Sequence, residues 1–199
     1  SQVNRSIDAF KEGGLFGVGQ GEGQLKNALQ ESHTDYIFAV IGEEYGALGC
    51  LIGCNQGEKE IINFFNQWSG ERLVMDKWFA IQVLKSSPEK ALETVKTLTG
   101  HKLFDMTNPN RFRAVFGSLT ANSVAFHQPS GQGYELLADW IIKLDQKNPL
   151  TSARMSTAFD TWKIYDMKRQ NLIKTQLNRI LNQKNLSKDT NEIIERILM

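Results

Sequence analysis

Apolar residues recur every three or four positions from Glu58 to the C-terminus, which is the spacing of one buried helix face. The first segment places these side chains on one side: Ile61, Ile62, Phe64, Phe65 and Trp68. The next repeats the spacing with Leu73, Met75, Trp78, Phe79, Val83 and Leu84. No strand-like alternation of useful length interrupts this pattern, which therefore predicts an all-α fold.

Several helix starts are marked by a capping side chain directly before a proline, as in Ser87-Pro88, Asn108-Pro109 and Asn148-Pro149. With the apolar spacing, these signals predict helix starts near Arg72, Pro88, Pro109, Gly133, Pro149, Met167 and Ser187. The two Asn-Pro starts lie 40 residues apart, which is about the length of a HEAT-type repeat of two helices. We therefore expect residues 58–199 to form a short α-solenoid of HEAT/ARM-like antiparallel helical hairpins.

The part of the chain before these helices has a different composition. Of the 16 glycines, 11 lie at or before Gly57, and both cysteines, Cys50 and Cys54, belong to the same part. Residues 1–54 carry three basic and seven acidic side chains, a formal −4, whereas the remainder carries 20 and 15, a formal +5. We therefore predict two pieces of separate origin, residues 1–54 and 55–199, the first being a glycine-rich N-terminal extension.

Charge and motif spacing exclude several classes of function. A formal net charge of +1 argues against a nucleic-acid partner. The glycine-rich run at 13–23 lacks the Gly-Lys-Ser/Thr ending of a phosphate loop. Residues 36–53 have about the length of a membrane span, but Glu43 and Glu44 lie near their middle. Because each charge costs about 2.5–3.5 kcal/mol at a bilayer centre, this segment alone is a poor transmembrane helix.

No complete metal or nucleophilic site is predicted within the chain. The three histidines are His33, His101 and His127, and none belongs to a His-Glu-x-x-His motif. No further thiol or nearby histidine completes a four-ligand set with the two cysteines, and no nucleophile elbow is present.

Arginines near helix starts are the candidate binding residues: Arg111, Arg113, Arg154 and Arg169. A guanidinium can bind a carboxylate through two hydrogen bonds, which suits recognition of the free end of a peptide. The alternative, which the residues alone favour, is a surface or intra-solenoid ion pair. The four tryptophans are expected to pack between helices rather than to bind a ligand.

The N-terminal part resembles a known membrane-protein family. Gly13-Gly14-Leu15-Phe16-Gly17-Val18-Gly19, together with residues 33–44, is similar to the last large extracytoplasmic loop of the FtsW/RodA cell-wall glycosyltransferases. The resemblance covers residues 1–53 and implies that Asp35 matches the family's proposed catalytic carboxylate. Because one carboxylate in a loop cannot polymerise glycan strands without the family's other membrane helices, Asp35 is not expected to be functional here.

A longer resemblance runs from about Asn63 to Ile197. It rests on Trp68-x-x-Glu71-Arg72-Leu73-Val74-Met75-Asp76-Lys77-Trp78-Phe79, Asn108-Pro109-Asn110-Arg111-Phe112-Arg113, Ala125-Phe126-His127 with Gly131-x-Gly133-Tyr134, and Tyr165-Asp166-x-Lys168-Arg169-Gln170. These segments resemble the C-terminal helical domain of bacterial aminopeptidase N, a family of zinc metallopeptidases.

This second resemblance implies a bowl-shaped α-solenoid that covers the catalytic domain and encloses a chamber for short peptides. It implies that Arg113 and Arg154 face the chamber and bind substrate, and that Leu150 replaces a glutamine common in the bacterial members. The family's zinc ligands and transition-state tyrosine belong to other domains. No cofactor is therefore expected in this chain, and no activity is expected from it alone.

The leading hypothesis is a truncated aminopeptidase N tail in the cytoplasm, with peptide as its partner only beside the missing catalytic domains. One alternative is an FtsW-like cell-division protein at the bacterial inner membrane, which contacts the bilayer through residues 36–53 and carries a helical accessory tail. Another is a generic helical scaffold that binds acidic or C-terminal peptide ends. The join between the two pieces is a gene fusion, a decayed gene or an assembly artefact.

Overall fold

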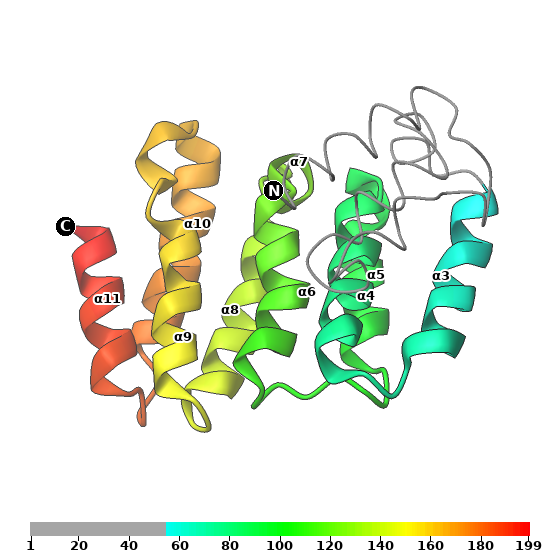
Figure 1. Ribbon diagram of the computed structural model, residues 1–199. Coiled ribbons are helices and arrows are strands. Elements are labelled where there is room, and N and C mark those ends of the chain that lie inside the picture. Colours follow the sequence, from blue (N-terminus) through cyan, green and yellow to red (C-terminus); the bar gives the residue numbers. More distant parts are fainter. Residues whose placement is uncertain (1–54) are drawn as a thin grey trace, which may run out of the picture. The chain divides into compact units, whose positions relative to one another are not determined.

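The computed structural model describes residues 55–199, which fold into helices joined by short turns (Figure 1). In chain order the α-helices are α3 (Asn55–Trp68), α4 (Arg72–Lys85), α5 (Pro88–Thr99), α6 (Pro109–Ala121), α7 (Ser123–Phe126), α8 (Gln132–Asp145), α9 (Pro149–Ser156), α10 (Met167–Leu181) and α11 (Lys188–Leu198). Two 3-10 helices, η2 (Thr157–Phe159) and η3 (Trp162–Ile164), lie between α9 and α10. Residues 55–199 contain no strand, so the predicted all-α class is confirmed.

The chain divides into two compact units, Ser1–Trp78 and Phe79–Met199. In the first unit, the described residues are α3 and the first half of α4. The Trp78 indole Nε1 donates a hydrogen bond to the Ile61 carbonyl oxygen at 3.0 Å, and the Phe65 and Trp78 ring centroids lie 5.0 Å apart. The predicted boundary between residues 54 and 55 lies at the edge of the described residues and stays a prediction.

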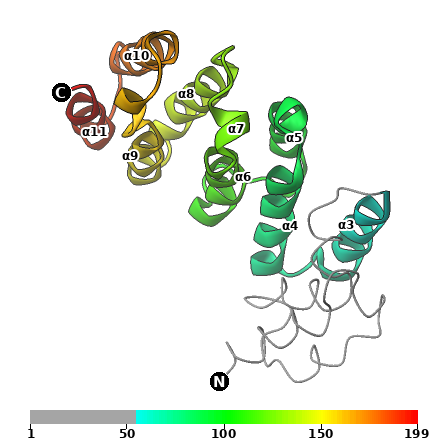
Figure 2. The same ribbon diagram turned by 90° about the horizontal axis from the view of Figure 1, so that it is seen from above.

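The second unit is a stack of helical hairpins. Its successive pairs are α5 with α6, α8 with α9, and α10 with α11, and the members of each pair pack against each other. Seen from above, α5, α8 and α10 form one layer and α6, α9 and α11 form the other (Figure 2). The short α7 connects α6 to the next hairpin and packs against both α6 and α8. This arrangement is the predicted solenoid of helical hairpins.

The core of the second unit is rich in aromatic rings. Phe112 stacks on Phe116 with ring centroids 4.5 Å apart, and the Trp140 ring lies 5.4 Å from Phe116 and 5.5 Å from Phe104. The buried Trp162 donates its indole Nε1–H to the Ile197 carbonyl oxygen at 2.8 Å, which ties the last turn of α11 to η3. Trp140 and Trp162 thus pack between helices, as the sequence predicts.

The observed helix starts match the predicted ones within one residue. A capping side chain bonds the first turn of α6, α9, α10 and α11, whereas Ser87 before α5 forms no such bond. Asp166 Oδ1 accepts from the backbone N–H groups of Lys168 and Arg169. The Ser187 hydroxyl accepts from the Thr190 N–H at the start of α11. Each such bond satisfies a donor that the first helical turn leaves without a partner.

Two glycines let α7 approach α8 closely. Gly131 has φ 74°, a left-handed conformation that side-chain-bearing residues rarely adopt. A Cβ on Gly133 would lie 2.5 Å from the Phe126 carbonyl oxygen, so only glycine fits there. The spacing Gly131-x-Gly133 is therefore required by the turn and by the backbone contact that follows it.

Among the helices of residues 55–199, none combines the length and the hydropathy needed to span a bilayer. Asp35 and the apolar segment 36–53 lie outside the described residues.

A buried carboxylate joins the last two hairpins. Asp145, at the end of α8, is 3% exposed. Its Oδ2 accepts from the Ser187 backbone N–H at 2.7 Å, and its Oδ1 accepts from the hydroxyls of Ser187 and Thr190 at 2.5 Å each. These donors stand at the start of α11, so one side chain fixes where that helix docks.

We predict that Asp145→Ala destabilises the chain by about 2–4 kcal/mol, because it removes a charged acceptor and leaves the Ser187 N–H and the buried Thr190 hydroxyl without their partner. The measurement is the free energy of unfolding from urea denaturation. Asp160→Ala is the control, since Asp160 is exposed, and its change is expected within about 0.5 kcal/mol. Equal small changes in both variants would contradict a structural role for Asp145.

Candidate functional site

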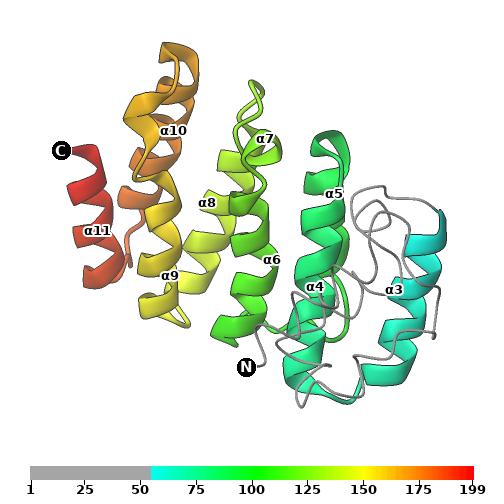
Figure 3. The same ribbon diagram turned by 45° about the horizontal axis from the view of Figure 1, so that its top comes forward.

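The candidate site lies on α6 and α9, which are neighbours in one layer (Figures 2 and 3). The Asn108 side-chain oxygen caps α6 by accepting from the N–H groups of Asn110 and Arg111, and the Asn148 oxygen caps α9 through the Thr151 N–H. The Asn148 amide also donates to the Thr107 carbonyl oxygen at 3.5 Å. The two helix starts are thereby linked.

Both predicted binding residues, Arg113 and Arg154, are exposed. Arg113 Nη2 donates to the Asn110 side-chain oxygen at 2.7 Å. Among the described residues, the Arg154 side chain has no hydrogen-bond or ion-pair partner. Because α6 packs on α5 and α7, and α9 packs on α8, the exposed faces of both helices point away from the second layer. The two guanidinium groups thus lie on one side of the stack.

The two helices carry arginine but no acidic residue. The α6 sequence is PNRFRAVFGSLTA and the α9 sequence is PLTSARMS. By contrast, α11 carries Asp189, Glu192 and Glu195 in eleven residues. α6 and α9 themselves thus contribute positive charge and no negative charge, which favours an anionic ligand, whereas the exposed carboxylates of this layer belong to α11, which packs against α9.

Arg111 has a structural position instead. It is buried, its Nη1 donates to the Leu103 carbonyl oxygen, and its guanidinium carbon lies 4.8 Å from the Phe79 ring centroid. A cation over an aromatic face is stabilised by the ring quadrupole. Arg111 thus holds the loop before α6 against the core.

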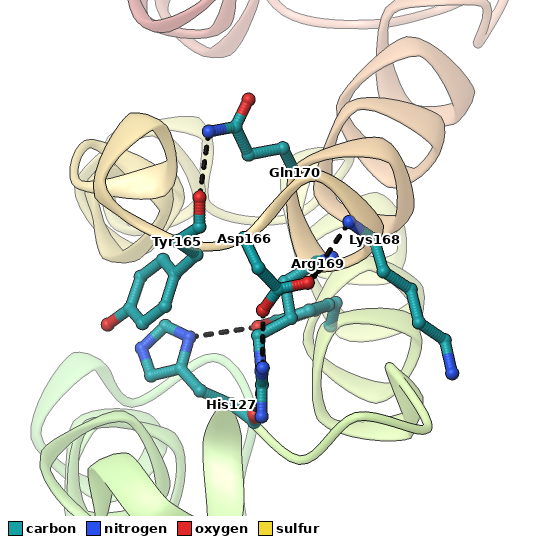
Figure 4. Close-up of polar contacts among 7 residues, drawn as sticks. His127, Tyr165, Asp166, Lys168, Arg169 and Gln170 are labelled. Atoms are coloured by element: carbon teal, nitrogen blue, oxygen red, sulfur yellow. Dashed lines mark hydrogen bonds and ion pairs between the residues drawn. The ribbon is translucent and has the colours of Figure 1, made fainter.

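Arg169 belongs to a second cluster, where α7, α8 and α10 meet (Figure 4). Its Nε donates to the His127 carbonyl oxygen at 2.7 Å, and its Nη1 forms an ion pair with Asp166 Oδ2. The His127 ring stacks on Tyr165 with centroids 4.1 Å apart. His127 Nδ1 lies 3.0 Å from the Tyr134 hydroxyl oxygen. This cluster, the His127 cluster, joins residues far apart in sequence.

The residues from Tyr165 to Gln170 form the turn that leads into α10, and side chains of this segment hold the turn in place. Gln170 Nε2 donates to the carbonyl oxygens of Tyr165 and Lys163 at 2.8 and 3.0 Å, while Asp166 caps α10. Four polar contacts therefore hold the turn between η3 and α10. Of the candidate arginines, Arg111 and Arg169 bind within the chain, and Arg113 and Arg154 face solvent.

The His127 cluster also shifts the pKa values of its members. Burial, and then the nearby Arg169 cation, lower the pKa of His127 below its ordinary 6.5. Burial raises the pKa of Tyr134 to about 12. The hydrogen bond from the Arg169 side chain lowers the pKa of Asp166. At neutral pH the cluster therefore holds a neutral imidazole beside an ion pair.

A shallow groove of about 560 Å³ borders this cluster. Its walls include Pro88, Val124, Gln128, His127, Tyr165 and Arg169. The Gln128 amide donates to the Pro88 carbonyl oxygen at 2.5 Å. Because Arg169 and Gln128 already bind within the chain, the groove offers a ligand no unengaged cation comparable to Arg154.

Residues 55–199 contain no group of three histidine, cysteine or acidic side chains placed to hold a metal ion. The predicted FtsW-like carboxylate, Asp35, is outside the described residues. The sequence did not point to the stacking of His127 on Tyr165, because its partners come from separate hairpins. The segments 125–127 and 165–170 are both visible in the sequence, but nothing in them shows that they contact each other.

A family model described as a domain of unknown function (DUF3458_C) with ARM repeats matches residues 25–199. Aminopeptidase N of Caulobacter vibrioides is 43% identical over 196 residues, which cover 89% of this chain and 22% of that protein. The crystal structure of Legionella pneumophila aminopeptidase A in complex with aspartic acid is similar with a TM-score of 0.71 and 28% identity. That similarity covers 98% of this chain and 20% of the other.

A second, shorter similarity is to a probable peptidoglycan glycosyltransferase FtsW of Caulobacter vibrioides, 47% identical over 47 residues, which cover 24% of this chain and 12% of that protein. Both resemblances predicted from the sequence are thereby confirmed. The chain spans about a fifth of the length of the aminopeptidase N relatives that it matches.

The lowered pKa of His127 predicts a loss of stability in mild acid. The unfolded chain binds the imidazole proton more tightly than the folded chain does. The contribution of neutral His127 to the free energy of unfolding is therefore fully present above the ordinary pKa of 6.5 and is lost as the pH falls below that value. Urea unfolding between pH 7 and pH 5 measures this slope. We expect the slope to decrease in His127→Gln.

The pKa of His101 is also lowered, with burial as the main cause, so His101→Gln is the matched comparison and the double variant should be nearly flat. The ordinary pKa values of Glu89 and Asp166, 4.5 and 3.8, lie below this pH range. An unchanged slope in the double variant would show that neither histidine carries the effect.

Proposed function

The chain belongs to the DUF3458_C family of ARM-repeat domains, and from this we propose that it acts as the non-catalytic C-terminal domain of an aminopeptidase N-like zinc metallopeptidase. In this proposal the solenoid encloses the substrate chamber and helps to bind the peptide. Peptide is its ligand in the context of the catalytic domains, and its location is the cytoplasm. The location rests on the likeness to aminopeptidase N alone.

The observation that supports peptide binding is the pair of exposed guanidinium groups on α6 and α9. Arg154 has no partner among the described residues, and neither helix carries an acidic side chain. A peptide that enters such a chamber presents a free carboxylate at its far end. Guanidinium groups bind carboxylates with charge-assisted hydrogen bonds, each contributing about 1.5–3 kcal/mol when water is excluded and less on an open surface.

The catalytic step is assigned to other domains. The chain contains no His-Glu-x-x-His sequence, and this motif supplies both zinc ligands and the general base in zinc peptidases of this type. The contribution of the solenoid is then positional, because a substrate held at its far end presents its scissile bond in a fixed place.

We expect Arg154→Ala to weaken the binding of a short peptide with a free C-terminus by about tenfold, equivalent to about 1.4 kcal/mol. We expect Arg113→Ala to have a smaller effect, because Asn110 already occupies one of its donors. Fluorescence anisotropy of an N-terminally labelled tetrapeptide measures the affinity, with the chain mixed with separately made upstream domains of an aminopeptidase N.

Arg196→Ala is the matched control for this experiment, since Arg196 is exposed on the acidic helix α11. The same peptide with an amidated C-terminus should bind weakly to every variant. Equal affinities for the free and amidated peptides, with the unmodified chain and the upstream domains together, would refute carboxylate recognition.

A separate prediction concerns turnover. The purified chain is expected to release no amino acid from an aminoacyl-anilide, and addition of separately made upstream domains of an aminopeptidase N is expected to produce activity. Release of the chromogenic anilide measures this activity. Zinc-dependent turnover by the chain alone would show that the assignment of a non-catalytic role is wrong.

A further inference from the structure

The segment that follows α7 is tied to two hairpins that are not neighbours in the stack. On one side, the Gln128 side-chain amide donates to the Pro88 carbonyl oxygen at 2.5 Å, at the start of α5 in the first hairpin. On the other side, the His127 carbonyl oxygen accepts from Arg169 Nε at 2.7 Å, in the first turn of α10 in the third hairpin. In a solenoid each repeat ordinarily contacts only its neighbours. Residues 127 and 128 therefore bridge the first and third hairpins and skip the second.

The His127 ring adds two further contacts to this bridge (Figure 4). It stacks on the Tyr165 ring with centroids 4.1 Å apart and an interplanar angle of 23°. Its Nδ1 lies 3.0 Å from the hydroxyl oxygen of Tyr134, a fully buried residue at the start of α8. The imidazole thus contacts both α8 and the turn before α10, so a change in its charge acts on both contacts.

The charged groups around this imidazole come from α5, from α10 and from the turn before α10. Arg169 binds the backbone carbonyl of His127 itself, and its cation opposes a second positive charge on the ring. Asp166 is bound by Arg169 and by the first N–H groups of α10. Glu89 is exposed on the wall of the neighbouring groove, and Lys168 is exposed and points away from the ring (Figure 4). Burial and Arg169 outweigh the two carboxylates, because the pKa of His127 is lowered.

Protonation changes the hydrogen bonds that this imidazole can make. In the neutral ring one nitrogen donates and the other accepts, whereas both nitrogens donate in the imidazolium. Burial raises the pKa of Tyr134 to about 12, so its hydroxyl keeps its hydrogen, which must turn away from a protonated Nδ1. The new charge also enters a partly buried place beside the Arg169 cation, which is unfavourable by desolvation and by like-charge repulsion. Both effects weaken the contacts of His127 with α8 and α10.

We infer that residues 127 and 128 form an acid-sensitive strut, which holds the start of α10 at a fixed distance from the start of α5 until the His127 imidazole is protonated. Protonation separates the ring from Tyr165, and the third hairpin then moves more freely relative to the first. The second hairpin keeps its place through the contacts of α8 with α9 and α10. The inference does not depend on the proposed function, because neither peptide nor zinc takes part in it.

The distance between α5 and α10 tests the strut directly. Spin labels are attached at Lys90→Cys and Asn171→Cys, two exposed positions near the starts of these helices, in the full chain with Cys50→Ser and Cys54→Ser. Double electron–electron resonance measures the distribution of label distances at pH 7.5 and pH 5.5. We expect this α5–α10 distribution to become about twice as wide at pH 5.5, because protonation populates the released state.

A second pair of labels detects general loosening of the stack. Lys143→Cys in α8 and Lys188→Cys in α11 are exposed positions in hairpins that Asp145 joins. Because this link does not involve His127, the distribution for this pair is expected to be the same at both pH values. Equal widening of both pairs at pH 5.5 would mean that acid loosens the whole stack, and the strut would be wrong.

Two substitutions separate the titrating ring from the bridge itself. His127→Gln removes the group that titrates, so the α5–α10 distribution is expected to lose its dependence on pH. Gln128→Ala removes the bond to the Pro88 carbonyl oxygen, so the distribution is expected to be wide at both pH values. Gln132→Ala is the matched control, since Gln132 is an exposed glutamine at the start of α8, and it should behave as the unmodified chain does.

Three results would overturn the inference. The first is an α5–α10 distribution that does not widen at pH 5.5 in the chain with His127 and Gln128 in place. The second is a full pH response in His127→Gln, since another group would then carry the effect. The third is a narrow distribution in Gln128→Ala at pH 7.5, since the first hairpin would then not be held by this bond. Thermal unfolding at pH 7.5 checks that each variant is folded.

Discussion

The hydrogen bonds that cap α6 and α9 are the constraint on which the exposed arginines depend. Asn108 and Asn148 accept from the first N–H groups of their helices, so each helix begins at a fixed residue. Since each residue turns an α-helix by about 100°, the start decides which side chains are buried. Phe112, Val115 and Phe116 enter the core of α6, and Arg113 is left in solvent. A shift of one residue would exchange these positions.

Much of the fold could be predicted because the signals that start its helices are local in the sequence. Proline after a serine or asparagine is visible in the sequence, and α5, α6 and α9 begin at the expected prolines. The short elements α7, η2 and η3 could not be predicted in this way, since fewer than five residues carry no helical periodicity. Their shape depends on contacts made elsewhere, such as the bond from the Trp162 indole to the Ile197 carbonyl oxygen.

The candidate site was predictable only in part. Four arginines near helix starts had the same local context, yet Arg111 is buried over Phe79 and Arg169 binds the His127 carbonyl oxygen. Arg111 and Arg113 are two residues apart and therefore point in very different directions around α6. Whether each arginine is buried, bonded or exposed depends on contacts with distant residues, which a single sequence does not reveal. The resemblance to aminopeptidase N singled out Arg113 and Arg154, both of which face solvent.

Repetition of a hairpin gives this solenoid a way to change its surface without changing its core. The cap and the proline fix the start of each helix, and residues such as Ser152 and Met155 fill the interior behind α9. The residue after the proline neither fixes the helix start nor fills the interior, because it is exposed in both α6 and α9. Asn110 accepts a hydrogen bond from Arg113, three residues later, whereas Leu150 offers no side-chain acceptor to Arg154, four residues later. The residue at this surface position can therefore differ between hairpins while both helices keep the same start.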